Sequence, residues 1–238
     1  MVIKEILDKK DELIDKEITV SGWIRNHRPQ KEFGFIDFSD GTCFKHLQIV
    51  YENTLPDFTK IAKLLVGCAL EVRGILVKSS GNQDVEVKAK EIKVLGNCPE
   101  DYPIQPKRHT NEFLREQAYL RARTNMFQAV FRIRSLAAQA IHKYFGDRGY
   151  VYVNTPIITA NDCEGAGEMF QVTTLDLERV AKNGEVDYSK DFFSKPTGLT
   201  VSGQLEGETF AMAFSKVYTF GPAFRAENSN TKTHMSEL

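Results

Sequence analysis

The sequence predicts two domains of different class, a small β-barrel followed by an α/β domain. Five short runs of β-type residues occupy roughly the first hundred positions, and one helical pattern separates the third run from the fourth. A polar segment with three prolines follows, and beyond it the longest helical pattern of the chain leads into another strand. A length of 238 residues fits one or two domains, and a hydrophobic share of 42% is sufficient for packed cores.

The first domain begins with an expected amphipathic helix over residues 2–14. The five β-runs that follow cover residues 18–25, 33–38, 47–51, 68–77 and 84–95. Apolar residues at helical spacing over 58–65 predict a helix after the third run. This order is typical of an OB-fold, a small barrel that binds oligonucleotides on one face, although SH3-like barrels can have a similar order.

Aromatic and amide side chains on these strands favour nucleic-acid binding. Phe33 and Phe35 lie on a strand interrupted by Gly34, where a base could approach and stack. Gln48 lies in the middle of the next strand and carries both a donor and an acceptor for a base edge. Because Phe33, Phe35 and Ile36 cannot all face the same side of a strand, one Phe could instead belong to the core.

A group of basic residues precedes this strand and is expected to form a loop suited to phosphates. A solvated surface is the alternative. The residues are Arg25, His27, Arg28 and Lys31.

The second domain is expected to start after a linker. Residues 96–108 contain Pro99, Pro103 and Pro106, so we place the first domain at 1–97, the linker at 98–111 and the second domain at 112–238. A long amphipathic helix is predicted over 121–145, with Gly149 as a stop signal. Residues 150–153 then read as a strand that ends before Thr155-Pro156.

Three further segments carry polar groups suited to a ligand. Glu164 and Glu168 flank two glycines that would let backbone approach a ligand, although an ordinary loop with surface acids has the same pattern. Residues 176–196 are charged and show no regular pattern, so we expect an irregular, flexible loop that closes over the site. A strand ending at Ser202 and a helix from Gln204 to about residue 214 form a strand-to-helix corner, a common place for ligands.

The end of the chain predicts a pair of strands, 217–220 and 223–227, separated by Gly-Pro. Arg225 and Glu227 are two residues apart, so on a strand they project from the same face. Arg suits a carboxylate or phosphate, and Glu accepts hydrogen bonds from an amine. The pair therefore describes a site for a phosphorylated, amino-bearing ligand, unless the two side chains form a plain salt bridge.

The string Phe224-Arg-Ala-Glu-Asn228, followed by His234 and Glu237, resembles motif 2 of the class II aminoacyl-tRNA synthetases. The resemblance is to the aspartyl, asparaginyl and lysyl subgroup and, within it, to the asparaginyl branch. The predicted long helix, the strand and Pro156 resemble motif 1 of the same family, which implies a homodimer formed through that helix and strand.

The resemblance implies ATP-dependent activation of L-asparagine to an adenylate, followed by transfer to the 3′ end of tRNA(Asn), with ATP and Mg²⁺ required. Arg225 would be the catalytic residue, bridging the amino-acid carboxylate and the α-phosphate. Glu227 would accept from the adenine amine, His234 would reach the terminal phosphates, and Glu237 would complete the ATP site.

The amino-acid site implied by the family comprises Glu164 at the α-amino group, together with Ser202 and Gln204. The aspartyl branch has Lys at the position of Gly207. Here no Lys is present, and the adjacent Glu208 would repel an aspartate carboxylate but accept from the amide of asparagine.

The first domain resembles the anticodon-binding domain of the same subgroup. This implies that Phe35 stacks on an anticodon base and that Gln48 contacts one. Arg25 and Glu86 are the further expected tRNA contacts.

Some positions depart from the family pattern. Thr233 replaces the usual Arg before His234, and Leu238 replaces a Phe that stacks on adenine. Motif 3 is absent from the 238 residues, so we expect a fragment that makes no adenylate by itself. An aspartyl enzyme or a non-catalytic tRNA-binding paralogue remains the alternative.

Composition sets the remaining expectations. A net charge of −1 gives no global basic field, so any RNA contact must be local. The cysteines are scattered, without a close pair of the kind that binds zinc, which indicates reduced thiols. No signal-peptide or membrane-spanning segment is present in the sequence, so a cytoplasmic protein is expected. The cysteines are Cys43, Cys68, Cys98 and Cys163.

Overall fold

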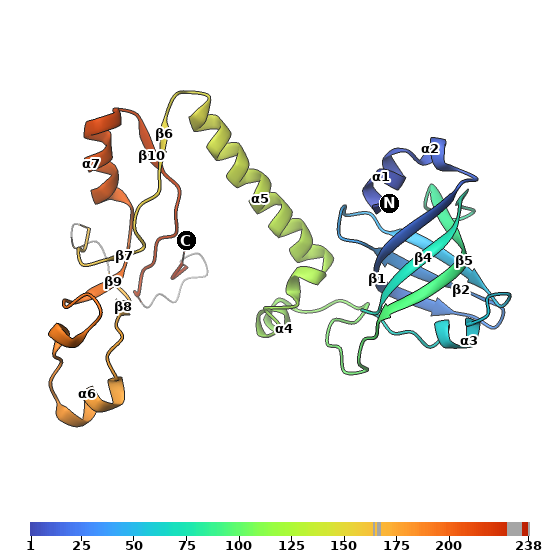
Figure 1. Cartoon of the computed structure of the whole chain (residues 1–238), viewed down its shortest axis with the longest axis horizontal. Helices are drawn as coiled ribbons and strands as arrows, with labels where there is room; N and C mark the ends of the chain where they lie inside the picture. The colour runs from blue at the N-terminus through green and yellow to red at the C-terminus, as the bar shows by residue number, and fades with distance from the viewer. Residues whose placement is uncertain (164, 166–167, 228–234, 238) are drawn as a thin grey trace. The chain divides into compact units, whose positions relative to one another are not determined.

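The computed structural model describes residues 1–163, 165, 168–227 and 235–237 (Figure 1). The chain forms two compact units, Met1–Arg134 and Ser135–Leu238, and each is described by itself. Among the described residues, no helix is long and apolar enough to span a membrane.

The first unit contains a closed barrel with the strand order β1-β2-β3-β5-β4. All neighbours are antiparallel except β3 and β5, whose parallel pairing closes the barrel. The predicted OB-fold is thereby confirmed. The strands are β1 (Glu17–Pro29), β2 (Phe33–Ser39), β3 (Leu47–Glu52), β4 (Ala69–Lys78) and β5 (Val85–Gly96).

Short helices cover the barrel. The expected helix over 2–14 is interrupted at Lys9, where the backbone leaves helical geometry, so that α1 (Ile3–Asp8) and α2 (Lys10–Leu13) are separate. Ile3 and Ile6 of α1 are fully buried in the barrel core. The helix between β3 and β4 is shorter than expected and ends as α3 (Phe58–Ile61).

Strand β2 shows strict alternation between the core and the outer face. Ile36 and Phe38 are fully buried, whereas Phe33 and Phe35 are half-buried on the outer face. Neither Phe belongs to the core, so the outer-face alternative holds for both.

Gly34 has a different role from the one expected of it. It faces inward, and a Cβ at this position would lie 2.3 Å from ring atoms of Tyr51. Tyr51 is fully buried, so the missing side chain makes room for this ring rather than for a base.

The segment after the barrel packs as a small cluster of its own. It contains α4 (Asn111–Glu116), the 3₁₀ helix η1 (Arg121–Arg123) and the start of α5 (Asn125–Gly146). Ile104, Leu114 and Leu120 form its buried core. The long helix predicted over 121–145 is confirmed, although its first turn forms η1.

The second unit contains two small sheets. β6 (Val151–Val153) pairs in parallel with β10 (Val217–Thr219), and the antiparallel order β7-β9-β8 forms the other sheet. Helix α7 (Gln204–Phe214) contacts both strands of the first sheet. The remaining strands are β7 (Ile158–Thr159), β8 (Gln171–Val172) and β9 (Thr197–Leu199).

The flexible loop expected over 176–196 contains regular structure, namely α6 (Leu177–Asn183) and η2 (Tyr188–Lys190). Asp176 caps α6 by accepting from two backbone N–H groups, and Gly184 ends it with φ of 72°. Asp191 joins the end of this segment to the residues that precede it, because its buried carboxylate accepts hydrogen bonds from Thr173 and Thr174. The expectation of an irregular segment was therefore wrong.

Candidate RNA-binding face and substrate site

The outer face of the barrel carries an aromatic pair. Arg28 lies opposite Phe35 in the β1–β2 register, and its guanidinium lies 5.3 Å from the centre of the Phe35 ring. Phe33 meets Phe35 edge to face at 5.3 Å between ring centres. A half-exposed aromatic with a cation beside it is suited to stacking with a base.

Gln48 and Glu86 extend this face across β3 and β5, where they are neighbours in the register. The Gln48 amide donates to the Glu86 carboxylate at 2.9 Å, and the Arg28 guanidinium donates to the Gln48 oxygen at 3.3 Å. Ser79 also donates to Glu86, at 2.8 Å. Phe35, Gln48 and Glu86 are thus brought together as predicted, with Arg28 joining them.

Arg25 does not join this group. It lies at a β-bulge between Ile24 and Asn26, and its guanidinium donates to the backbone carbonyl of Arg123. Burial lowers the pKa of Arg25. The bulge directs it toward the segment after the barrel, which the sequence pattern did not reveal.

The expected basic loop is a continuation of strand β1, which runs to Pro29. His27 lies within it and contacts the backbone oxygen of Leu64 at 2.8 Å. A carbonyl only accepts, so His27 Nδ1 donates and its Nε2 accepts from the Tyr51 hydroxyl at 2.7 Å. Both ring nitrogens are thus engaged within the barrel, which favours a structural role over a phosphate contact, and burial lowers the pKa of His27.

The strand predicted over 223–227, which carries Arg225 and Glu227, is reduced to one bridge between Phe224 and Glu237. Both side chains are exposed, and neither forms an ion pair with a described residue. Within the described part of the chain, the expected alternative of a plain salt bridge between them is not observed.

Backbone hydrogen bonds connect this segment to two other predicted pieces. The Phe224 N–H donates to the Thr200 carbonyl at 2.8 Å, and the Ala226 N–H donates to the Glu168 carbonyl at 2.7 Å. The N–H of Arg225, the residue between these two, donates to the Ser236 carbonyl at 2.9 Å. Arg225 is consequently held beside the Glu168 loop and the strand-to-helix corner.

The corner itself is formed as expected, although β9 ends at Leu199, before Ser202. The Ser202 hydroxyl accepts from the Gln204 N–H at 3.2 Å. The Gln204 amide donates to the Glu208 carboxylate, one helical turn further on, at 3.0 Å. Gly203 fits closely here, because a Cβ would lie 2.7 Å from the Thr155 hydroxyl and would force that side chain to move.

Two predicted site residues, Glu164 and His234, lie outside the described residues, and Glu237 lies exposed at the bridge to Phe224. Arg28 was expected only as part of a basic loop suited to phosphates, and its contacts with Phe35 and Gln48 were not predicted, although its position opposite Phe35 in a hairpin could have shown them. Cys163, whose thiol lies 3.6 Å from the Gln204 side-chain oxygen, left no signal in the sequence.

Barrel and corner together define a two-domain protein that joins an OB-fold to an α/β domain with a cation and carboxylates at a strand-to-helix junction. Residues 18–95 match the family of OB-fold nucleic acid binding domains, and residues 110–238 match the tRNA synthetases class II (D, K and N). The chain belongs to this class II tRNA synthetase family.

Curated proteins that are similar to the chain include asparagine–tRNA ligases. The chain is 56% identical over 242 residues to the enzyme of Acholeplasma laidlawii and 55% identical over 239 residues to that of Clostridium tetani. These alignments cover 100% and 99% of the chain but 52% of each relative, so the chain spans about half the length of the curated relatives it matches.

Solved structures share the fold. Asparaginyl-tRNA synthetase from Pyrococcus horikoshii, complexed with asparaginyl-adenylate, has a TM-score of 0.82 at 24% identity, covering 100% of this chain and 50% of that chain. A putative aspartyl-tRNA synthetase from Leishmania major has a TM-score of 0.74 at 18% identity, covering 95% and 44%.

Proposed function

We propose that this chain supplies the tRNA-anticodon domain and part of the catalytic site of an asparagine–tRNA ligase. The enzyme would activate L-asparagine with ATP to asparaginyl-adenylate and then transfer the asparaginyl group to the 3′ end of tRNA(Asn). The observation that carries the proposal is the set of backbone bonds that hold the Arg225 segment between Glu168 and Thr200.

Arg225 and Glu227 divide the nucleotide between them in this proposal. The Arg225 guanidinium binds the amino-acid carboxylate and the α-phosphate, and it stabilises the charge that develops as the carboxylate attacks phosphorus. The Glu227 carboxylate accepts from the adenine amine. Both side chains are exposed and form no ion pair with a described residue, so they are accessible to a ligand. We propose ATP contacts for Glu237 and His234 as well.

Ser202, Gln204 and Glu208 form the proposed pocket for the amino acid, with Glu164 at the α-amino group. The Glu208 carboxylate accepts one hydrogen bond from Gln204 and retains lone pairs for the side-chain amide of asparagine. The same carboxylate would repel aspartate. Since Glu208 is exposed without a ligand, bound substrate must exclude water before this repulsion reaches its full magnitude.

We propose that Mg²⁺ accompanies the ATP. The described residues contain no group of His, Cys, Asp or Glu side chains that could hold a metal ion, so no step is assigned to it. Positioning and charge neutralisation by Arg225 are what these residues contribute to the reaction.

The barrel is proposed to bind the tRNA anticodon through the face of Phe35, Gln48 and Glu86. Arg28 replaces Arg25 as the cation of this face, because Arg28 is the one that contacts Phe35 and Gln48. We keep the proposed division into an anticodon domain at 1–97, a linker at 98–111 and a catalytic part at 112–238.

A homodimer through α5 and β6 is also proposed. No residue of α5 is buried, although the helix is amphipathic, and Ile133 and Leu136 are about two-thirds exposed, at 66% and 65%. Exposed apolar residues on a long helix favour a partner surface. All four cysteines are free thiols, as a reducing compartment would leave them, which supports a cytoplasmic location.

Thermal protection tests the proposal on the chain itself. We expect a non-hydrolysable analogue of asparaginyl-adenylate to raise the melting temperature, and the aspartyl analogue to do so much less. Arg225→Ala should remove the protection. Equal protection by both analogues, or protection that survives in Arg225→Ala, would contradict the proposed site.

A further inference from the structure

We propose that the cavity between the barrel mouth and the segment after β5 binds the sugar-phosphate backbone of RNA, next to the bases read by Phe35 and Gln48. This inference rests on the proposed tRNA binding and assigns a second contact surface to the same unit. It concerns the backbone that flanks the anticodon, not the anticodon bases.

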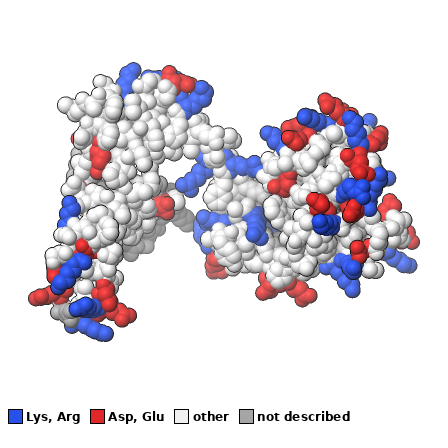
Figure 2. Space-filling view, viewed as in Figure 1, with Lys and Arg blue, Asp and Glu red and all other residues white. Residues whose placement is uncertain are grey.

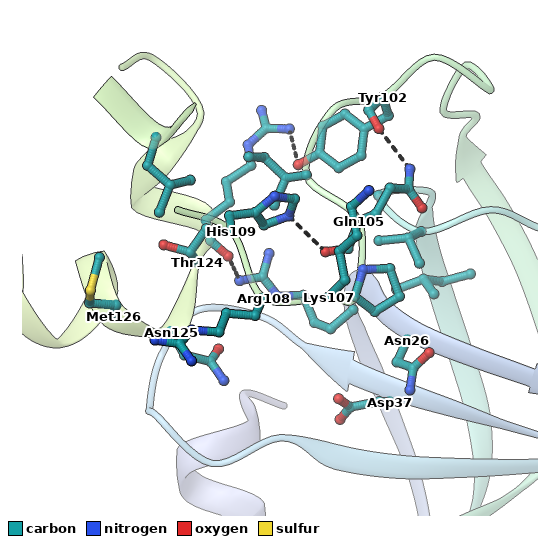
Figure 3. Close-up of a pocket in the computed structure, with 18 of the residues that line it drawn as sticks. Asn26, Asp37, Tyr102, Gln105, Lys107, Arg108, His109, Thr124, Asn125 and Met126 are labelled. Carbon is teal, nitrogen blue, oxygen red and sulfur yellow. Dashed lines mark hydrogen bonds between the residues drawn. The ribbon is translucent and has the colours of Figure 1, made fainter. Parts of the chain in front are cut away.

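The cavity has a volume of about 1010 Å³, and most of the residues that line it are polar or charged. Figure 3 shows Asn26 and Asp37 on the barrel strands facing the segment that carries Lys107, Arg108 and His109. Its cations come from both sides of the opening and are Arg25, Lys107, Arg108 and Arg123.

Lys107 and Arg108 are the cations available to a ligand. Both are exposed, and neither forms an ion pair or a side-chain hydrogen bond with any described residue. Arg25 and Arg123 are already engaged, since Arg25 donates to the Arg123 carbonyl and Arg123 donates to the Tyr102 hydroxyl at 3.2 Å. An anion entering the cavity would therefore meet two unpaired cations within a positively charged wall.

The acids of the lining do not cancel these charges. Asp37 already contacts His46, whose Nδ1 lies 3.0 Å from both carboxylate oxygens. Glu112 is the other acid of the lining. Its carboxylate lies 3.9 Å from the guanidinium of Arg115, a residue that does not line the cavity. Four cations against two partnered acids leave the cavity with a net positive charge.

The cavity continues the proposed anticodon face. Asp37 follows Phe35 by two residues on β2, so both project from the outer face, roughly 7 Å apart. Asp37 also lies opposite Gln48 in the register and lines the cavity. An RNA strand with a base stacked on Phe35 would carry its adjoining backbone toward the cavity mouth.

The lining favours a phosphate backbone over a nucleobase. The rings of the lining are already engaged, because the Tyr102 hydroxyl accepts from Arg123 at 3.2 Å, His109 stacks on Phe113 at 4.9 Å between ring centres, and His46 contacts Asp37. Asn26 and Asn125 add amide donors suited to phosphate oxygens. Elsewhere the visible barrel surface mixes positive and negative side chains (Figure 2), so this local group is what would attract RNA.

The test uses the whole chain and an RNA anticodon stem-loop. The variant Lys107→Ala/Arg108→Ala should bind about 2- to 30-fold more weakly than wild type, the range for two exposed ionic contacts. The loss should be the same for matched and mismatched anticodons. The slope of log K against log salt should become shallower by about 1.4, since each single-strand phosphate contact accounts for about 0.7.

Matched variants separate a local contact from a general loss of charge. Lys9→Ala/Lys93→Ala removes two exposed cations elsewhere on the same unit and should leave the slope unchanged. Lys107→Arg/Arg108→Lys keeps the charges and should bind as wild type does. If Lys107→Ala/Arg108→Ala behaves as the control pair does, the inference is wrong.

Two further outcomes distinguish this inference from the proposed function. One outcome is that the protein still discriminates between anticodons and loses RNA affinity in Phe35→Ala, while Lys107→Ala/Arg108→Ala binds RNA as wild type does. In that case only the cavity assignment fails. If wild type binds no RNA, both fail. Weaker binding of free AMP by the cavity variant, without weaker RNA binding, would identify a mononucleotide site and overturn the inference.

Discussion

The amide of Gln48 donates to the carboxylate of Glu86 at 2.9 Å, across the parallel pair of strands that closes the barrel. A carboxylate only accepts, so this bond fixes which end of the amide is nitrogen. The Gln48 oxygen in turn accepts from Arg28 at 3.3 Å. Gln48 is thus held in one orientation before any base arrives.

Glu86→Gln should relax the discrimination among anticodons. The new amide at position 86 can pair with Gln48 in either orientation, so only the longer, exposed bond from Arg28 still favours one of them, while the shape of the face is kept. We expect the ratio of dissociation constants for mismatched and matched stem-loops to fall by about tenfold, within the 1–3 kcal/mol of a good base contact. Glu91→Gln, an exposed residue on the same strand, is the control and should keep the ratio.

Phe35→Ala should weaken RNA binding by about 1–3 kcal/mol, the usual contribution of one stacked base. The side chain is only half-buried on the outer face, so the barrel should remain folded. Filter binding or fluorescence anisotropy would measure the loss, and Phe44→Ala, an exposed aromatic outside the strands, serves as its control. An unchanged affinity for RNA would exclude Phe35 as a stacking platform.

Gly34→Ala should destabilise the barrel by about 1–3 kcal/mol, since a Cβ at 2.3 Å from the buried Tyr51 ring forces repacking. Urea unfolding measures the change. Gly146→Ala is a matched control, because nothing lies within 4 Å of its Cβ position. Equal stability of the Gly34 variant and wild type would show that the ring does not occupy this space.

Alkaline pH should reveal the burial of Tyr51. Burial raises its pKa to about 12, above the value near 10 in the unfolded chain. The folded state therefore keeps the proton longer, and the stability that this contributes is present below pH 10 and is lost as the pH rises to 12. By pH 11 the ionisation of Tyr51 in the unfolded chain should by itself lower the free energy of unfolding by about 1.4 kcal/mol.

Tyr51→Phe should lack this alkaline loss when unfolding is measured from pH 8 to pH 11. The variant also leaves His27 Nε2 without its donor, which should cost about 1–3 kcal/mol at neutral pH. Tyr119→Phe, at a side chain that is 78% exposed, should follow the wild-type curve. A parallel decline in wild type and Tyr51→Phe would contradict the assignment.

Alternation along strands made the barrel and its outer face predictable. The period of two in β2 and β3 placed Phe35 and Gln48 on a common surface once the strand order was known. The β-bulge at Arg25 broke that pattern, and a bulge depends on pairing with distant strands rather than on local sequence. For the same reason the sequence favoured Arg25 over Arg28.

The second unit was only partly predictable, and the strength of the capping signals did not decide which helix was found. Helix α7 begins at Gln204 and ends at Phe214, as expected. Helix α6 was missed although Asp176 and Gly184 mark both of its ends, because the charged composition around it was given more weight. The bonds that join Ala226 to Glu168 link loops almost sixty residues apart, and no local pattern encodes them.

Substrate selection gives the most direct measurement of the central claim. Residues 1–238 would replace the corresponding half of the Acholeplasma laidlawii asparagine–tRNA ligase, which is 56% identical to them. Pyrophosphate exchange of this hybrid would then be followed with asparagine and with aspartate. We predict exchange with asparagine that is lost in Arg225→Ala, and little exchange with aspartate; preference for aspartate, or full activity of the Arg225→Ala hybrid, would contradict the account.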